Sequence, residues 1–264
     1  MTAVAVDLLQ ASSLFVSPHY DDVPLSCGGV VAALAERGWA PRMVTVFASE
    51  LVDAMVGEFA AWKHARWRLE EPDSVLSTRR AEDAEAAKTL GCEARWLGLP
   101  DAIYRGDRYT SDQELFGRLH AEEEELGEVL ADELTQLPEW RDGDRVFVPL
   151  GIGSHVDHQL AFEAGRRLAR RGVEVFAYED CPYAIHTPEG VGRRLDAVRD
   201  HVGEPVLIPI GAAIERRLDA IACYRSQIPV IFRFTDDFRR AVRAFALDRG
   251  GLRGPVERFW PVLG

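Results

Sequence analysis

The chain has 264 residues, of which 47% are hydrophobic and 28% charged, and its formal net charge is −12 at pH 7. This length and composition fit one folded domain over residues 1–264 and argue against a disordered or fibrous protein. They also argue against a nucleic-acid or membrane partner, because phosphate groups are bound by clustered Lys and Arg. With no signal peptide and no apolar segment of about 18 residues, we expect a cytoplasmic protein. Homo-oligomer formation stays open.

Apolar strand-like runs alternate with amphipathic segments along the chain. In chain order, the pattern predicts a strand at 13–17, a helix at 26–38, a strand at 42–49, a helix at 77–92, a strand at 93–99, a helix at 113–137, a strand at 144–150, a helix at 159–172, a strand at 173–180, a strand at 205–210, a helix at 212–226 and an Arg-rich last helix. The predicted fold class is therefore α/β, a single Rossmann-like domain with a mainly parallel sheet and helices on both faces.

The sequence also supports predictions for two loop segments, for the cysteines and for one acidic run. Segments 50–76 and 100–112 are predicted to shape the pocket, because loops above a sheet edge vary between relatives. The four cysteines lack CxxC spacing and are expected to be reduced thiols. The acidic run 122–125 is expected to be a solvated helix face.

Two polar motifs follow the first and fourth predicted strands. "PHYDD" (18–22) and "GSHVDH" (153–158) should meet at the carboxyl edge of the sheet, where such folds bind ligands. Together they carry His19, Asp21, Asp22, His155, Asp157 and His158. Either motif alone could be a helix-capping turn. The second lacks the Lys-Ser/Thr of a phosphate-binding loop, which argues against a nucleotide site.

This set of side chains suits a metal centre with an open position. Two imidazoles and one carboxylate bind divalent ions, and a zinc-bound water has a pKa near about 7. Asp21 could take the proton of that water, and His155 could act as an acid or as an oxyanion partner. The same donor set occurs in non-haem iron oxygenases, which usually have a barrel-like fold.

The sequences "SPHYDDVPLSCGG" and "GSHVDHQLAFEAG" resemble the PIG-L/LmbE-like family of metal-dependent deacetylases. Its members remove acetyl groups from N-acetylglucosamine-type sugars, and related members cleave mycothiol conjugates or act in antibiotic biosynthesis. The likeness continues through "RRAEDAEAAKTLG", "WLGLPDAIYR", "YEDCPYAIH" and "YRSQ", from about residue 13 to 230.

The resemblance implies a division of roles among the motif residues. It implies Zn²⁺ bound by His19, Asp22 and His158, with Asp21 as general base. It implies that His155 stabilises the tetrahedral intermediate or protonates the leaving amine, with Asp157 orienting the His155 ring. The candidate substrate contacts are Arg79 (or Arg80), Tyr20 and Asp101, although Tyr20 could merely fill space.

The chain departs from the family's His-Pro-Asp-Asp-Glu motif at two positions. Tyr20 replaces the proline and Val23 replaces the glutamate, which removes a hydrogen bond that supports the loop. The predicted function is a zinc-dependent hydrolase that removes an N-acetyl group from an amino sugar or a related small natural product or thiol conjugate. A catalytically idle member that keeps the metal to bind a ligand is the alternative that Val23 raises.

Overall fold

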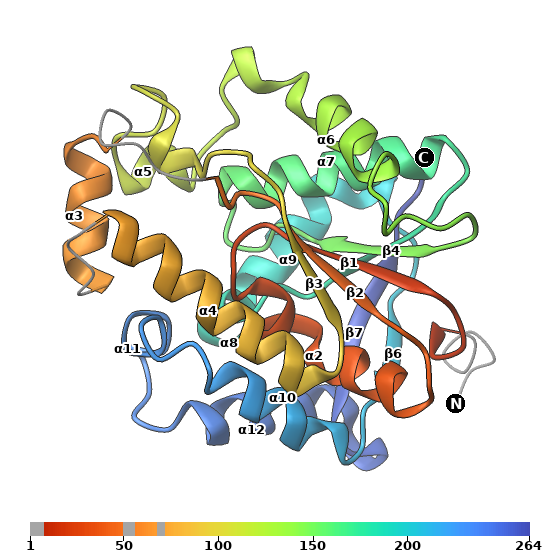
Figure 1. Cartoon of the computed structure of the whole chain (residues 1–264). Coiled ribbons are helices and arrows are strands. Elements are labelled where there is room, and N and C mark those ends of the chain that lie inside the picture. Colours follow the sequence, from red (N-terminus) through yellow and green to blue (C-terminus); the bar gives the residue numbers. More distant parts are fainter. Residues whose placement is uncertain (1–7, 50–55, 68–71) are drawn as a thin grey trace.

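The computed structural model describes residues 8–49, 56–67 and 72–264, and a seven-stranded sheet forms its centre (Figure 1). The strands are β1 (Ser13–Ser17), β2 (Arg42–Thr45), β3 (Glu93–Trp96), β4 (Arg145–Pro149), β5 (Glu174–Tyr178), β6 (Val206–Pro209) and β7 (Val256–Pro261). Their order is β3-β2-β1-β4-β5-β7-β6. Strands β1 to β5 pair in parallel, and β7 runs antiparallel to β5 and β6. The α/β prediction is confirmed, but strand β7 was not predicted.

Helices cover both faces of the sheet. They are α2 (Asp22–Glu36), α3 (Glu58–Trp67), α4 (Pro72–Leu90), α5 (Asp112–Leu115), α6 (Leu126–Thr135), α7 (Val156–Arg170), α8 (Tyr183–His186), α9 (Pro188–Val198), α10 (Ala213–Ile221), α11 (Ile228–Ile231) and α12 (Phe238–Gly250). Helices α2, α4 and α10 pack together on one face, and α6 and α7 pack on the other (Figure 1).

The core is divided by the sheet because strand side chains alternate in direction. Phe15 and Phe147 stack at 4.5 Å and belong to the core beneath α2 and α10. Their neighbours Leu14, Val16 and Val146 belong to the second core, beneath α6 and α7. Strands buried on both sides in this way require helices on both faces.

The helix predicted over 113–137 is present only in part and is not continuous. The structure has α5, a 3₁₀ turn at Ala121–Glu123 and then α6 in that stretch. Within the acidic run, Glu123 is only 2% exposed and accepts hydrogen bonds from Arg105 (2.9 Å) and Tyr109 (2.8 Å). The other three glutamates of the run, at 122, 124 and 125, are exposed as expected, so the expectation of a solvated face is wrong for Glu123 alone.

Two predicted helices begin earlier than expected, and this matters for the site. Helix α2 begins at Asp22 instead of residue 26, and α7 begins at Val156 instead of residue 159. Asp22 and His158 therefore lie in first helical turns. Helices α8 and α9 were not predicted, whereas the strand at 205–210 is present as β6.

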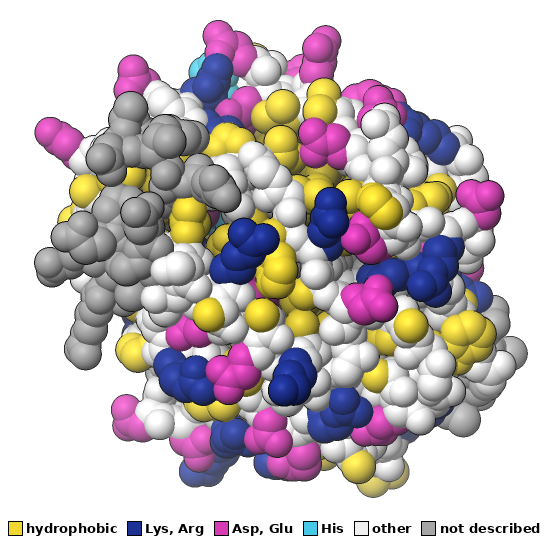
Figure 2. Space-filling view, viewed as in Figure 1, with side chains coloured by type: hydrophobic (Ala, Val, Ile, Leu, Met, Phe, Trp, Pro, Cys, Tyr) yellow, Lys and Arg dark blue, Asp and Glu magenta, His cyan; other side chains and the backbone are white. Residues whose placement is uncertain are grey.

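The remaining expectations concern loops, thiols and surface. Of segment 50–76, residues 50–55 and 68–71 lie outside the described residues, and α3 occupies the part between them. All four cysteines are free. Among the described residues, no helix has the length and apolarity to cross a membrane. Acidic and basic side chains are interspersed over the face seen in Figure 2, which shows no continuous basic patch.

Candidate active site

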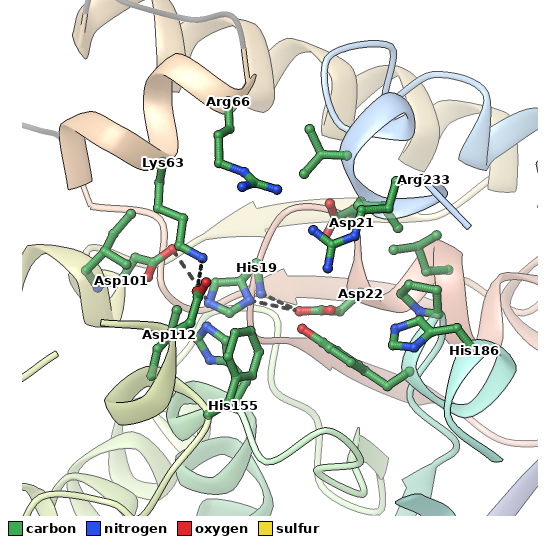
Figure 3. Close-up of a pocket in the computed structure, with 18 of the residues that line it drawn as sticks. His19, Asp21, Asp22, Lys63, Arg66, Asp101, Asp112, His155, His186 and Arg233 are labelled. Atoms are coloured by element: carbon green, nitrogen blue, oxygen red, sulfur yellow. Dashed lines mark hydrogen bonds and ion pairs between the residues drawn. The ribbon is translucent and has the colours of Figure 1, made fainter. Parts of the chain in front are cut away.

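Both motifs lie at one edge of the sheet because β1 and β4 are parallel neighbours. Their side chains open into a cavity of about 460 Å³, which His19, Asp21, Asp22 and His155 help to line (Figure 3). The strand order reverses direction between β1 and β4, and such switch points are where open α/β sheets bind ligands. The predicted meeting of the two motifs is confirmed.

The first motif is a turn held by its own hydrogen bonds. The Ser17 hydroxyl donates to the carbonyl of His19 (2.6 Å) and accepts the N–H of Val23 (3.2 Å). Asp22 Oδ2 accepts the N–H of His19 at 2.8 Å. The Val23 side chain is fully buried in the core, so the turn is closed without the glutamate that the family motif usually has.

Asp22 lies close to both of the other predicted ligands. Asp22 Oδ2 lies 3.3 Å from His19 Nδ1 and 3.3 Å from His158 Nε2. Ligand atoms about 2.0–2.1 Å from a tetrahedral zinc lie roughly 3.3–3.4 Å apart, so these separations fit a shared ion. His158 Nε2 is buried and makes no hydrogen bond within the described residues, as expected for an atom that is free to bind a metal.

The electrostatics around Asp22 favour positive charge. Burial alone would lower the pKa of His158, but the carboxylates of Asp22 and Asp180 raise it to about 9. Burial would raise the pKa of Asp22, but His158 and His19 hold it well below its usual value. A field that stabilises a proton on these rings also stabilises a divalent cation between them.

A second donor set shares two of these residues. Nitrogen atoms of His19, His155 and His158 lie within 4.8 Å of one another. However, His155 Nδ1 accepts the backbone N–H of Asp157 at 3.2 Å, which leaves one ring nitrogen for other contacts. We therefore favour Asp22 over His155 as the third ligand, because Asp22 Oδ2 lies between the other two.

Asp21 precedes the proposed ligand Asp22 in the chain and also lines the cavity. Burial and the neighbouring Asp22 raise the pKa of Asp21 to about 6. The guanidinium of Arg79 lies 3.9 Å from its carboxylate and also lines the cavity. Arg80 is exposed and stacks on Trp96, so the structure places Arg79 at the mouth of the cavity.

The structure does not support a substrate contact by Tyr20. This side chain is 3% exposed, and it is absent from the described cavity lining. Its ring lies under the Arg79 guanidinium, 5.2 Å from ring centre to guanidinium carbon. Tyr20 thus supports Arg79. Asp101 does line the cavity, with its carboxylate 3.6 Å from His19 Nε2.

His155 and Asp157 differ from the expected pair. The contact to the His155 ring comes from the backbone N–H of Asp157, while the Asp157 carboxylate lies 3.0 Å from His19 Nε2. Arg105 donates to the other carboxylate oxygen at 2.6 Å. Asp157 therefore orients His19. Because a backbone N–H can only donate, His155 carries its proton on Nε2, and burial holds its pKa well below the usual value.

Two residues that follow β5 complete the site and were not singled out from the sequence. Asp180 accepts from His158 Nδ1 at 2.7 Å and from the N–H of Gly151 at 2.9 Å. Tyr183 packs edge-on against His158, and a Cβ on Gly153 would lie 2.6 Å from its ring. The only sequence signal was their place in "YEDCPYAIH", a stretch that resembles the family.

Comparison with known proteins now identifies the family. The profile described as "PIG-L: GlcNAc-PI de-N-acetylase" matches residues 14–169, which is more than half of the chain. The chain belongs to the PIG-L family. It is 29% identical over 263 residues to the 2'-N-acetylparomamine deacetylase of Niallia circulans, covering 94% of this chain and 89% of the relative. The 2'-N-acetylparomamine deacetylase of Streptomyces fradiae is 34% identical over 185 residues, covering 67% of this chain and 59% of the relative.

Solved structures extend the likeness within the PIG-L family over the whole fold. The A40926 pseudoaglycone deacetylase matches with a TM-score of 0.78 and 25% identity, covering 96% of this chain and 97% of that chain. The zinc-inhibited form of teicoplanin deacetylase matches with a TM-score of 0.80 at 23% identity, covering 96% and 98%. The latter similarity supports the fold alone.

Proposed function

We propose that this chain is a metal-dependent N-deacetylase that hydrolyses the N-acetyl group of an amino sugar or an amino-sugar natural product. The observation that carries the proposal is the close approach of Asp22 to both His19 and His158, at the floor of a cavity that His19, Asp21 and Asp22 help to line. A volume of about 460 Å³ is in the range of small-molecule sites. The names of the PIG-L relatives, which are deacetylases of N-acetylparomamine and of a pseudoaglycone, support this substrate class.

We propose His19, Asp22 and His158 as the ligands and zinc as the ion. The set of two histidines and one carboxylate is typical of catalytic zinc sites. When bound, the ion would supply a Lewis acid that lowers the pKa of water and polarises the acetyl carbonyl. Asp180 and Asp157 contact the two rings at the nitrogens that face away from Asp22, which would fix the orientation of both rings.

Asp21 is the proposed general base. Its pKa of about 6 leaves it ionised at neutral pH yet able to accept a proton from water. Arg79, 3.9 Å away, keeps the carboxylate directed toward the cavity. His155, neutral and protonated on Nε2, is the proposed hydrogen-bond donor to the oxygen that becomes negative in the tetrahedral intermediate. When that intermediate collapses, the C–N bond breaks, the amine takes the proton from Asp21, and acetate leaves.

The direct test measures metal content and acetate release from a panel of N-acetylated sugar glycosides. We expect Asp21→Asn to retain its metal and lose about 10²–10⁴-fold in kcat, since it removes the proton acceptor. His158→Ala should lose the metal itself. The matched pair Asp22→Asn and His155→Ala separates the two possible donor sets, because only loss of a ligand should reduce metal content.

Three outcomes would contradict the proposal. Stoichiometric zinc with no turnover of any substrate would indicate an idle member of the family. Native iron with oxygen consumption would indicate the oxygenase chemistry, against which the α/β sheet already argues. Full metal content in His158→Ala would overturn the ligand assignment. A cytoplasmic location, a single domain over residues 1–264 and the oligomeric state stay predictions.

A further inference from the structure

The cavity wall carries equal numbers of acidic and basic side chains, but they are unequally paired. The lining includes the carboxylates Asp21, Asp22, Asp101 and Asp112 and the cations Lys63, Arg66, Arg79 and Arg233. Each of the four carboxylates has a partner. Asp21 pairs with Arg79, and Asp112 pairs with Lys63. Asp22 and Asp101 lie beside histidines of the site. Arg66 and Arg233 make no ion pair with any residue that the structure describes.

These two arginines reach the cavity from different elements. Arg66 lies in the last turn of α3, with its guanidinium 4.7 Å from the centre of the Trp62 ring. Arg233 follows α11, and it lies near enough to His186 for its charge to add to burial in lowering the pKa of that histidine. Figure 3 shows both guanidinium groups directed into the cavity, on the side away from His155.

Two unpaired guanidinium groups in a concave wall favour an anion. Each guanidinium presents planar N–H donors that match a carboxylate or phosphate, and each bond is charge-assisted. The formal charge of the protein is −12, so its overall field does not attract an anion. A ligand with an acidic group would therefore be held by contacts inside the cavity and not by the overall field.

We propose that Arg66 and Arg233 form an anion subsite that binds a carboxylate or phosphate group of the substrate, away from the N-acetyl group that is cleaved. This rests on the proposed function and deepens it: the preferred substrates are acidic N-acetylamino sugars. Ile231 and Phe234, which line the same wall, add apolar contact area beside the anion.

The test compares kcat/KM for N-acetylglucosamine, N-acetylglucosamine 6-phosphate and N-acetylglucosaminuronic acid. The two acidic sugars distinguish phosphate from carboxylate recognition. We expect the wild type to prefer at least one acidic sugar, and the double variant Arg66→Gln/Arg233→Gln to reduce that preference by about tenfold or more. Raising the salt to about 0.5 M should reduce it as well, because partly exposed charges are screened. Arg240→Gln, at an exposed position of α12 outside the described lining, removes one positive charge elsewhere and should keep the preference.

A binding measurement separates this subsite from the reaction. Calorimetric titration of chelator-treated protein with the same three sugars should show tighter binding of the acidic ones in wild type and Arg240→Gln, and not in the double variant. Circular dichroism and the melting temperature check that the variants fold. Turnover with no preference for acidic sugars would overturn the subsite and leave the deacetylase proposal standing. Absence of all turnover, together with binding of an acidic sugar that depends on the two arginines, would support the subsite and contradict the deacetylase proposal. An equal loss in Arg240→Gln would also overturn the subsite.

Discussion

Residues 14–169, which match the family profile, and residues 170–264, which follow it, contribute different things to one cavity. The first part supplies both polar motifs and therefore the proposed ligands and base. The second part supplies Asp180 behind His158, Tyr183 beside it and Arg233 at the cavity wall. The proposed chemistry is thus concentrated in the first part, whereas the second part adds a partner for His158 and one wall of the cavity.

The second part also holds the first helix of the site in place. Helix α2 departs from helical geometry at Cys27 (φ −139°), and just beyond it the Glu257 carboxylate of β7 accepts the N–H groups of Gly29 (2.8 Å) and Val30 (2.7 Å). Any Cβ on Gly29 would lie 2.6 Å from Ile210, so the close approach requires glycine. Asp22 stands at the start of this helix, so β7 supports a proposed ligand from a distance.

The largest effect is expected for Glu257→Gln. Arg217 Nη1 lies 3.1 Å from this buried carboxylate, and neutralising the carboxylate leaves the buried guanidinium unpaired. We expect the free energy of unfolding to fall by about 3–5 kcal/mol, as measured by urea denaturation. The control Glu215→Gln breaks an exposed pair with Arg243, which solvent screens, and should change the free energy of unfolding far less. Equal costs for the two variants would mean that β7 does not brace α2.

A second effect, on metal binding, is expected for Asp180→Asn. The change weakens the acceptor that faces His158 Nδ1 and should reduce metal affinity about 10–100-fold. Competition with a chromogenic chelator measures this affinity. Asp200→Asn, on the exposed turn Arg199–His201, is the matched control. Unchanged metal affinity would mean that residues 170–264 do not contribute to metal binding through Asp180.

A third effect, confined to the pH dependence of stability, concerns Asp83 of α4, a buried carboxylate that joins the two parts. It accepts hydrogen bonds from Tyr224 (2.5 Å) and Trp96 (2.8 Å), and burial raises its pKa to about 7. The native state then keeps a proton that the unfolded state releases above about pH 4, so this group's contribution to stability falls as pH rises from about 4 to about 7.

The variant Asp83→Asn has no titrating group at this position. Its free energy of unfolding should therefore fall less steeply with pH than that of the wild type, by up to about 1.4 kcal/mol per pH unit. Urea denaturation of wild type and variant at several pH values between 4.5 and 7.5 measures the difference in slope. Parallel curves for the two proteins would show that Asp83 keeps an ordinary pKa and that its contact with Tyr224 carries no pH dependence.

Much of the fold, and the meeting of the two polar motifs, could be predicted because both follow from local sequence patterns. Alternating apolar runs indicated parallel strands with helices on both faces, and strand ends in a parallel sheet share an edge, so His19 and His158 were expected to meet. The prediction of one continuous helix over 113–137 was wrong. Glu123 pairs with Arg105 there, and helix propensity does not encode such a contact. Tyr20 could be read either way until its burial beneath Arg79 was known.

The sequence by itself determined the α/β class, the family resemblance and the two motifs whose residues line the cavity. Only the tertiary structure decided which groups support them: Asp157 on His19 instead of His155, Asp180 on His158, and β7 against α2. It also left Arg66 and Arg233 without acidic partners in the described wall. The reason is physical. Spacing along the chain fixes which side chains share a strand end or a helix turn, but a carboxylate's partner depends on how distant segments pack.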